Sequence, residues 1–399
     1  MVIILNDRQR KPAQPGAAKF SPRERGIALI VVMGFIIVLA VLSTAFAINM
    51  RVEAILSKNA NSEADAEWLC RSGVEFSKYI LGQQMANNQE PYDCLNQSWA
   101  GGPGQASGFN PILDNINLTN NTWAEGTVLG FLFPDESPGD KVRCSIKIVD
   151  LERKFNINRA AEDPIGRWPL ENTFAIMGVD QSLIPFLVDA IKDWRDPDED
   201  SRISGVESDY YQPLGYTAKN GPIDDLQELL LIRYITPKMY WGNRANQLAN
   251  TGLNASGPAT PDEEGEGEIE EDYPIGLVDL FTPISIGYVN INTASMEVLQ
   301  LLPGMDENRA AFIIDRRVGL DDEEGTDDDV PFRNISEIQS VPGFQTAEAV
   351  QNVRRFLSVR SATFEVTVTA EMRDQRRTLV AVLNRSSPTD VKILYTYWK

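Results

Sequence analysis

Five carboxylates that could bind a metal ion lie close together in the middle of the chain. They are Asp196, Asp198, Asp200, Glu207 and Asp209. Counted from the first, the first four occupy positions 1, 3, 5 and 12, the ligand spacing of an EF-hand loop. An EF-hand needs glycine at position 6, and this chain has Ser201 there, so a true EF-hand is not expected. Carboxylates alternating around a turn can still converge on a hard cation, and all-oxygen ligands suit calcium.

The alternative for this segment is a solvated acidic loop. A chain with 57 acidic and 37 basic residues contains acidic runs by chance. Two observations favour a calcium site. Like charges this dense repel one another unless they are neutralised, and Trp194, Tyr210 and Tyr211 flank the loop as anchors. A second acidic run, residues 321–329, has a less specific spacing and is expected to be solvated.

A segment near the N-terminus is long and apolar enough to cross a membrane. Residues 27–50 contain no charged side chain. A helix of this length extends roughly 36 Å, more than the hydrocarbon core of about 30 Å. Residues 1–26 carry six basic and two acidic side chains, so the N-terminus is predicted to stay in the cytoplasm. We therefore expect a single-pass protein of the inner membrane whose remaining domains are periplasmic.

The residues just before this segment resemble a prepilin-type leader. Arg25 and Gly26 stand directly before the apolar run, and in such leaders prepilin peptidase cuts after the glycine. The resemblance implies that Gly26 ends the leader and that Ile27 begins the mature chain, with the apolar helix retained. Cleavage by signal peptidase is the alternative, because residues 43–47 offer small side chains.

Composition excludes several functions. The chain has no histidine, which removes Ser-His-Asp and Cys-His catalysis and the usual zinc sites, and we expect no enzymatic activity. Its net charge of −20 makes it a poor partner for nucleic acid. The three cysteines form no CxxC pair, and one disulfide with one free thiol is possible. The pairing cannot be read from the sequence; Cys94 with Cys144 is preferred, because Cys70 is expected on a helix.

The order of predicted elements indicates an α+β fold with a split sheet. A helix is expected to continue from residue 51 to 86, and residues 87–125 form a loop. Five strands are predicted, two before and three after a long intervening region; they are residues 126–133, 141–150, 362–372, 376–384 and 391–398. Alternation of polar and apolar residues suits one half-buried antiparallel sheet. Residues 51–154 and 357–399 are therefore predicted to form one head, interrupted by an α-helical domain at 155–356.

The inserted region contains an internal repeat. The sequence Asn-Ile-Asn occurs at 156–158 and again at 290–292, and each copy is followed by two helix patterns and an acidic loop. We interpret this as a duplicated helical hairpin unit, with residues 254–272 as an acidic disordered linker. The second copy resembles a helix-hairpin-helix, which often binds DNA. Residues 289–356 carry 13 acidic side chains against six arginines, so packing against protein is favoured.

Together these features resemble the K minor pseudopilins of type II secretion. The resemblance rests on the leader, the long helix, the split sheet, and the motifs DWRDPD at 193–198 and VNINTA at 289–294. It implies a subunit that starts or caps a periplasmic pseudopilus, binds calcium, and assembles with the I and J minor pseudopilins. Prepilin peptidase and the major pseudopilin are further implied partners. The alternatives are a membrane-anchored DNA receptor and a minor pilin of a type IV pilus.

One residue fits a position at the filament tip. Pilin-like subunits carry glutamate at mature position 5, where it neutralises the N-terminal amine of the subunit ahead. Counted from Ile27, that position is Val31. A charge among apolar helices is costly unless it is paired, so a subunit that lacks this carboxylate is expected to sit first.

Overall fold

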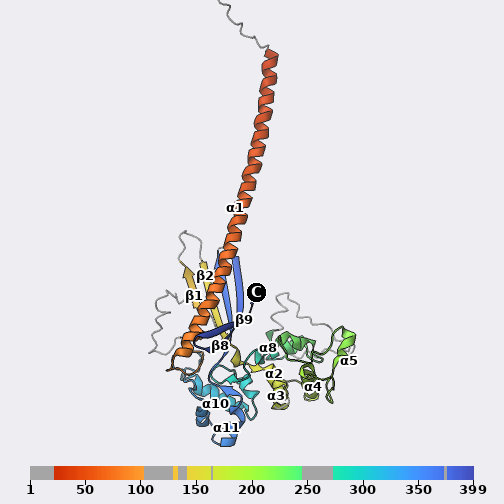
Figure 1. Cartoon of the computed structure of the whole chain (residues 1–399), viewed down its shortest axis with the longest axis vertical. Coiled ribbons are helices and arrows are strands. Elements are labelled where there is room, and N and C mark those ends of the chain that lie inside the picture. The colour runs from red at the N-terminus through yellow and green to blue at the C-terminus, as the bar shows by residue number, and fades with distance from the viewer. Residues whose placement is uncertain (1–21, 103–128, 134–141, 163–164, 245–272, 373–374) are drawn as a thin grey trace, which may run out of the picture. The chain divides into compact units, whose positions relative to one another are not determined.

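The computed structural model describes residues 22–102, 129–133, 142–162, 165–244, 273–372 and 375–399 (Figure 1). The remaining residues of the predicted leader and the predicted linker 254–272 lie outside these ranges. The chain divides into two compact units, residues 1–64 and residues 65–399. Each unit is described by itself.

In the first unit the described chain is helical. It belongs to α1 (Pro22–Ala86), a single helix of 65 residues, as the sequence predicts for the part after residue 51. The apolar side chains of residue 27 and residues 29–50 are exposed, and among the described residues they belong to neither core cluster. By length and composition α1 is able to cross a membrane.

In the second unit the sheet has five strands, all antiparallel. They are β1 (Leu129–Phe133), β2 (Val142–Asp150), β7 (Thr363–Met372), β8 (Gln375–Ser387) and β9 (Asp390–Trp398), in the order β1-β2-β7-β8-β9 (Figure 1). The central pair joins β2 to β7 across about 200 residues of intervening chain, with Ile146 opposite Val368. The prediction of one antiparallel sheet in an α+β fold is confirmed.

The last turns of α1 pack on one face of this sheet. Val74 and Leu81 of α1 share a buried cluster with Ile146 of β2 and Val368 of β7. The contact is close at Gly73, where a β-carbon would lie 2.6 Å from Cγ1 of Val368. Glycine weakens a helix by about 1 kcal/mol relative to alanine, and here it permits the close approach of helix to sheet.

The inserted region contains short helices and two-residue strands. Its first half comprises β3 (Phe155–Asn156), α2 (Ile157–Ala160), α3 (Trp168–Met177), α4 (Ile184–Arg195), α5 (Ser208–Tyr211), η4 (Gln212–Leu214), η5 (Leu226–Leu231), α6 (Pro237–Trp241), α8 (Leu277–Leu280) and β4 (Phe281–Thr282). Its second half comprises β5 (Val289–Asn290), α9 (Met296–Gln300), α10 (Glu307–Arg317), η6 (Ile335–Ser340), α11 (Ala347–Arg354) and β6 (Leu357–Ser358). Two further short helices, η1 (Ser98–Ala100) and η2 (Leu151–Arg153), precede it.

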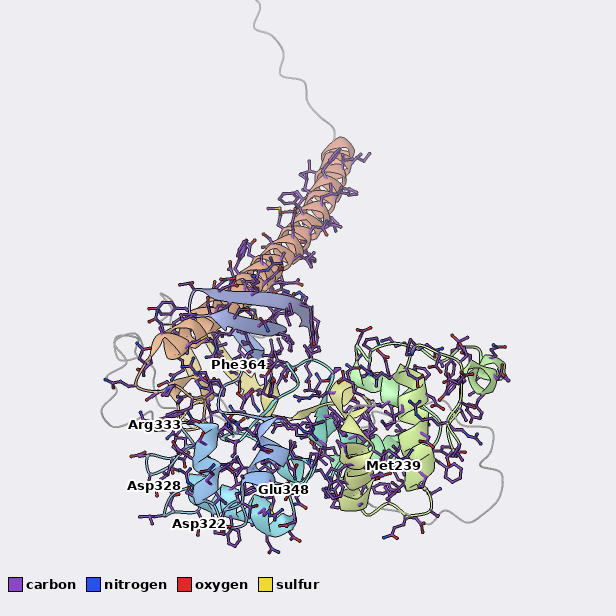
Figure 2. All side chains as sticks on the ribbon, turned by 60° about the horizontal axis from the view of Figure 1, so that its bottom comes forward. Met239, Asp322, Asp328, Arg333, Glu348 and Phe364 are labelled. Carbon is purple, nitrogen blue, oxygen red and sulfur yellow. The ribbon has the colours of Figure 1, made fainter. Side chains whose placement is uncertain are left out.

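One hydrophobic core runs through both halves of this region. It begins at Phe155, ends at Leu357, and includes Met239 of the first half (Figure 2). The core between α1 and the sheet is a separate cluster, which includes Phe364 (Figure 2). The change from one core to the other therefore falls at the two places where the chain leaves and re-enters the sheet.

The two halves make the same contacts at the repeated Asn-Ile-Asn sequence. The last asparagine of the first copy, Asn158, accepts from the backbone N–H of Ile223 (2.7 Å) and donates to its carbonyl oxygen (2.8 Å). Asn292 makes the same two bonds with Phe332, at 2.7 and 3.0 Å. Each half is also closed by a parallel strand pair, β3 with β4 and β5 with β6. These matched contacts support the interpretation of a duplication.

A buried ion pair lies where the insertion joins the sheet. Arg385 of β8 pairs with Asp93, and both side chains are almost fully buried. Arg385 also donates to the carbonyl oxygens of Leu81 (3.1 Å) and Ser361 (2.7 Å). The backbone N–H of Ser361 donates to Asp93 at 2.9 Å. The end of α1, the segment after it and the last strands are thereby fixed to one another.

Two buried carboxyls extend this network into the insertion. Asp150 accepts from Thr293 (2.5 Å) and from the side-chain amide of Asn290 (3.3 Å). Glu152 accepts from the backbone N–H of Thr363 at 2.9 Å. Burial and the neighbouring Asp150 raise the pKa of Glu152 to about 8. Arg333 of the second half adds a contact outside the network, donating to the carbonyl oxygen of Gln89 at 2.6 Å (Figure 2).

The cysteine pairing differs from the preferred prediction. All three cysteines are buried free thiols, so the proposed Cys94–Cys144 disulfide is wrong for this structure. Cys144 lies on β2 in the core between helix and sheet, where Cys70 of α1 also packs. Cys94 lies in the segment after α1, where its thiol donates to Asn96 Oδ1 at 2.7 Å. The strand carries Cys144 into the core between helix and sheet, and among the described residues Cys94 is a member of neither core cluster.

We call the two hydrogen bonds of Asn158 with Ile223, and those of Asn292 with Phe332, asparagine clamps. We expect the two clamps to contribute differently to the free energy of unfolding. Asn292→Ala leaves the N–H and C=O of Phe332 without the clamp's bonds in a buried site, and a loss of about 2–4 kcal/mol of unfolding free energy follows. Asn158 is less buried, so Asn158→Ala is expected to cost about half as much. Denaturant unfolding of the full chain in detergent measures both. Equal stability of the parent and Asn292→Ala would show that the clamp is dispensable.

Glu152 is expected to make stability depend on pH. Its pKa is about 8 in the folded protein, whereas an ordinary glutamate, as in the unfolded chain, has a pKa of 4.5. As the pH rises, the unfolded chain therefore loses this proton first. The free energy of unfolding therefore falls between about pH 4.5 and 8, by at most about 1.4 kcal/mol per pH unit from this group. Unfolding measured at pH 5 and pH 8 tests this. Glu152→Gln should reduce the loss of unfolding free energy between these two pH values. Glu75→Gln, which removes an exposed carboxyl of α1, should leave that loss unchanged.

Candidate metal centre

The acidic loop begins where α4 ends. Helix α4 stops at Arg195, and Asp196 is its extended C-cap, with ψ of 160°. Pro197 follows, and a residue before proline is disfavoured in the helical region. The loop closes at Glu207, the extended N-cap residue of α5. Both ends of the loop are therefore held by short helices whose positions are fixed by the core.

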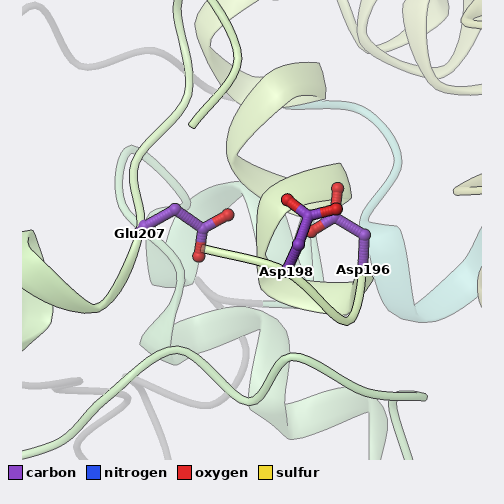
Figure 3. Close-up of side chains that lie close together, drawn as sticks. All are labelled: Asp196, Asp198 and Glu207. Atoms are coloured by element: carbon purple, nitrogen blue, oxygen red, sulfur yellow. The ribbon is translucent and has the colours of Figure 1, made fainter. Parts of the chain in front are cut away.

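Three of the five predicted ligands come together. Asp196, Asp198 and Glu207 each offer a carboxylate oxygen, and these oxygens lie within 4.8 Å of one another. Figure 3 shows the first two side by side at the end of α4, with Glu207 pointing toward them from the other side of the loop. Asp200 and Asp209 are exposed and lie outside this group. Asp200 contributes its backbone N–H, which donates to Asp198 Oδ1 at 3.0 Å.

Glu207 is the member whose surroundings most resemble a cation site. The residue is buried, and neither carboxylate oxygen accepts a hydrogen bond from the described residues. Burial, and after it the charges of Asp193 and Asp196, raise the pKa of Glu207 to about 8. A buried carboxylate is costly without a partner. A hard cation would supply that partner, so this oxygen-only group fits calcium.

Arg202 is a functional residue that the sequence analysis missed. Its guanidinium pairs with Asp193 at 2.6 Å and also with Asp196. Its backbone N–H donates to Asp193 as well, at 3.1 Å. It is the only basic residue between 196 and 209, and this was the available signal. An ion bound by Asp196 would compete with Arg202 for that carboxylate.

Gly205 is a second missed residue. A β-carbon at this position would lie 1.8 Å from Oδ2 of Asp193, so only glycine lets the loop pass over that buried carboxyl. The adjacent Ser204 donates its backbone N–H to Asp189 at 3.2 Å. Two carboxyls on one face of α4 thus fix the path of the loop.

Aromatic side chains hold the two ends of the loop together. Trp194, the next-to-last residue of α4, meets Tyr211 of α5 edge to face, with ring centroids 5.2 Å apart. Tyr211 stacks on Tyr216 at 5.3 Å and is fully buried. Tyr210 packs edge to face on Tyr211 at 5.2 Å. The structure therefore places these aromatic residues as anchors of the loop.

The second acidic loop, residues 321–329, uses its carboxylates internally. Asp328 accepts from the backbone N–H of Leu320 (2.6 Å) and from the hydroxyl of Thr326 (2.8 Å), and these bonds lower its pKa. Asp329 accepts from the N–H of Gly325 at 2.9 Å. Among the described residues these carboxylates form no metal group of the kind found at Asp196.

The predicted processing and tip residues lie at the start of α1. Gly26, Ile27 and Val31 all fall within the helix. The side chains of Ile27 and Val31 are exposed. This arrangement leaves both residues accessible to other helices or to lipid.

Comparison with known proteins agrees with these features. Residues 153–242, which contain the acidic loop, match the family model described as type II secretion system (T2SS), protein K. A type II secretion system protein K from Pseudomonas aeruginosa is 21% identical over 382 residues, covering 93% of this chain and 92% of that protein.

A solved structure has the same fold. It is the crystal structure of the GspK-GspI-GspJ complex from the type 2 secretion system of enterotoxigenic Escherichia coli, whose matching chain has a TM-score of 0.57 and 14% sequence identity. The match covers 86% of this chain and 99% of that chain. In its long apolar helix, split antiparallel sheet and helical insertion, the chain is thus similar to protein K of type II secretion systems over most of its length.

Proposed function

We propose that this protein is the minor pseudopilin at the tip of a type II secretion pseudopilus, which it starts or caps. The observation that carries the proposal is the uncharged segment 27–50 of α1, whose described apolar side chains are exposed and in which Val31 stands where a carboxylate would otherwise pair with the subunit ahead. A subunit without this carboxylate offers no such pairing, so the filament can begin with it.

Its proposed partners are the I-type and J-type minor pseudopilins. The support is the fold shared with a chain of the GspK-GspI-GspJ complex. The major pseudopilin would follow these subunits in the filament. Before assembly, the apolar part of α1 would anchor the protein in the inner membrane, with the N-terminus in the cytoplasm and the second unit in the periplasm.

DNA binding is not favoured by the hairpin between α9 and α10. Asp306 caps α10, and its carboxylate accepts from the backbone N–H of Arg309 at 2.9 Å. This occupies a helix N-terminal N–H group that a phosphate would use. Glu307, in the first turn, adds a second negative charge. We therefore propose a structural role for this hairpin and no nucleic-acid partner.

We further propose that Asp196, Asp198 and Glu207 hold a calcium ion. The ion would neutralise the carboxylates that crowd this loop and fix it between α4 and α5. The support is the convergence of the three carboxylates and the burial of Glu207, whose carboxylate accepts no hydrogen bond from the described part of the chain. The remaining oxygens of a calcium site commonly come from backbone carbonyls and water.

Processing by prepilin peptidase is the first test of the proposed class. Co-expression of the full chain with the peptidase should give a mature protein whose mass corresponds to a start at Ile27. Gly26→Val is the control, because it removes the small residue before the cut, and it should remain uncleaved. An intact leader in the parent chain, or a cut after Ala47, would contradict the assignment.

Calcium binding is tested by comparing a variant of a carboxylate inside the group of Asp196, Asp198 and Glu207 with a variant of one outside it. Calcium should raise the melting temperature of the full chain in detergent, and a chelator should reverse this. Asp198→Asn is expected to weaken calcium binding at least tenfold, because it removes one of the three converging carboxylates. Asp200→Asn is the matched control and should have little effect, since Asp200 lies outside the group. No calcium-dependent shift in the parent chain, or equal losses in both variants, would overturn the proposed site.

A further inference from the structure

The last strand of the sheet ends in an uncharged, apolar segment. In the described sheet β9 is a terminal strand, paired only with β8. Residues 393–398 (ILYTYW) contain no charge, although the whole chain has a net charge of −20. Native edge strands are usually guarded by charges, prolines or bulges, because their free backbone groups pair readily with other strands. The pairing of β9 with β8 is irregular only in its first part, and residues 395–398 pair in regular register.

The side chains of this edge are exposed on both faces of the sheet. Ile393, Leu394, Tyr395, Tyr397 and Trp398 are each between 41% and 50% exposed. On one face, Tyr395 and Tyr397 stack on each other with centroids 6.3 Å apart. They oppose the buried valines of β8 in the register. Trp398 lies on the other face. An exposed apolar strip of this kind marks an interaction site.

The hydrogen-bond register shows which backbone groups are free. The N–H of Lys399 donates to the carbonyl oxygen of Thr378 at 3.0 Å. Facing residues of an antiparallel pair alternate between those that exchange both bonds and those that exchange none. Tyr397 and Tyr395 therefore bond to β8, opposite Val380 and Val382. The N–H and C=O groups of Thr396 and Trp398 point away from β8.

We propose that this edge of β9 receives an extended strand from a partner pseudopilin, which continues the sheet. The inference rests on the proposed function for the identity of that partner. A strand satisfies the free backbone groups and covers both apolar faces at once. A helix would leave the backbone groups unpaired, and so would a lipid surface, where unpaired groups are costly. A second copy of this chain is disfavoured because a tip subunit occurs once in each filament.

Thr396 gives a selective test. Proline there removes an N–H that points away from β8, and proline is tolerated on that side of an edge strand. Thr396→Val keeps the N–H and is the matched control. Both variants are expected to melt within a few degrees of the parent chain, and Thr396→Lys, which keeps the backbone but adds a charge, replaces the proline variant if that one fails to fold.

The measurement is recovery of the I-type and J-type minor pseudopilins of the same cell with the tagged full chain in detergent. Thr396→Pro should recover at least tenfold less of one partner, and Thr396→Val as much as the parent. Undiminished recovery with Thr396→Pro overturns the docking edge alone. No recovery with the parent overturns the proposed partners, and this inference with them. Self-association of the parent that Thr396→Pro abolishes assigns the edge to a second copy and overturns the proposal.

Discussion

The buried network around Asp93, Arg385, Asp150 and Glu152 is the constraint on which the rest of the structure depends. A sheet that is interrupted after β2 and resumed at β7 has to close a gap of about 200 residues, and both crossings pass through this network. Breaking one partner of a buried pair leaves an uncompensated charge, which costs several kcal/mol. The network therefore specifies how the insertion meets the sheet, and two separate hydrophobic cores can form on either side of it.

Beyond this junction, the two halves of the insertion are built alike but differ in one loop. Each half is pinned by an asparagine clamp, which spans 65 residues in the first half and 40 in the second. The extra length of the first half includes the loop from Asp196 to Glu207. Three of its carboxylates converge, whereas Asp328 and Asp329 bond to groups in or beside their own loop. Among the described residues, the shared framework thus carries a candidate metal centre in the first half.

The sequence predicted the elements better than the contacts between distant residues. The uncharged run and the alternating strands depend on local patterns, so the long helix and the single sheet were predictable. Asp200 was predicted as a ligand from its spacing, yet its N–H bonds to Asp198 and its side chain is exposed. Arg202 and Gly205 matter through Asp193, which lies on a preceding helix. The only local signal was that Arg202 is the single basic residue of the loop, and this does not identify Asp193 as its partner. The predicted Cys94–Cys144 disulfide was wrong for the same reason, since Cys144 is placed in the core between helix and sheet by contacts with distant residues.

The missing carboxylate at Val31 is the feature from which we propose a position at the filament tip. The most direct measurement is immunogold labelling of pseudopili assembled with a tagged copy of the chain. We expect label at one end of each filament for the parent chain, and label along the shaft for Val31→Glu, whose carboxylate can pair with a subunit ahead. Val32→Glu, with the charge one residue away, should give no label along the shaft. Label along the shaft with the parent chain would contradict the proposed position at the tip.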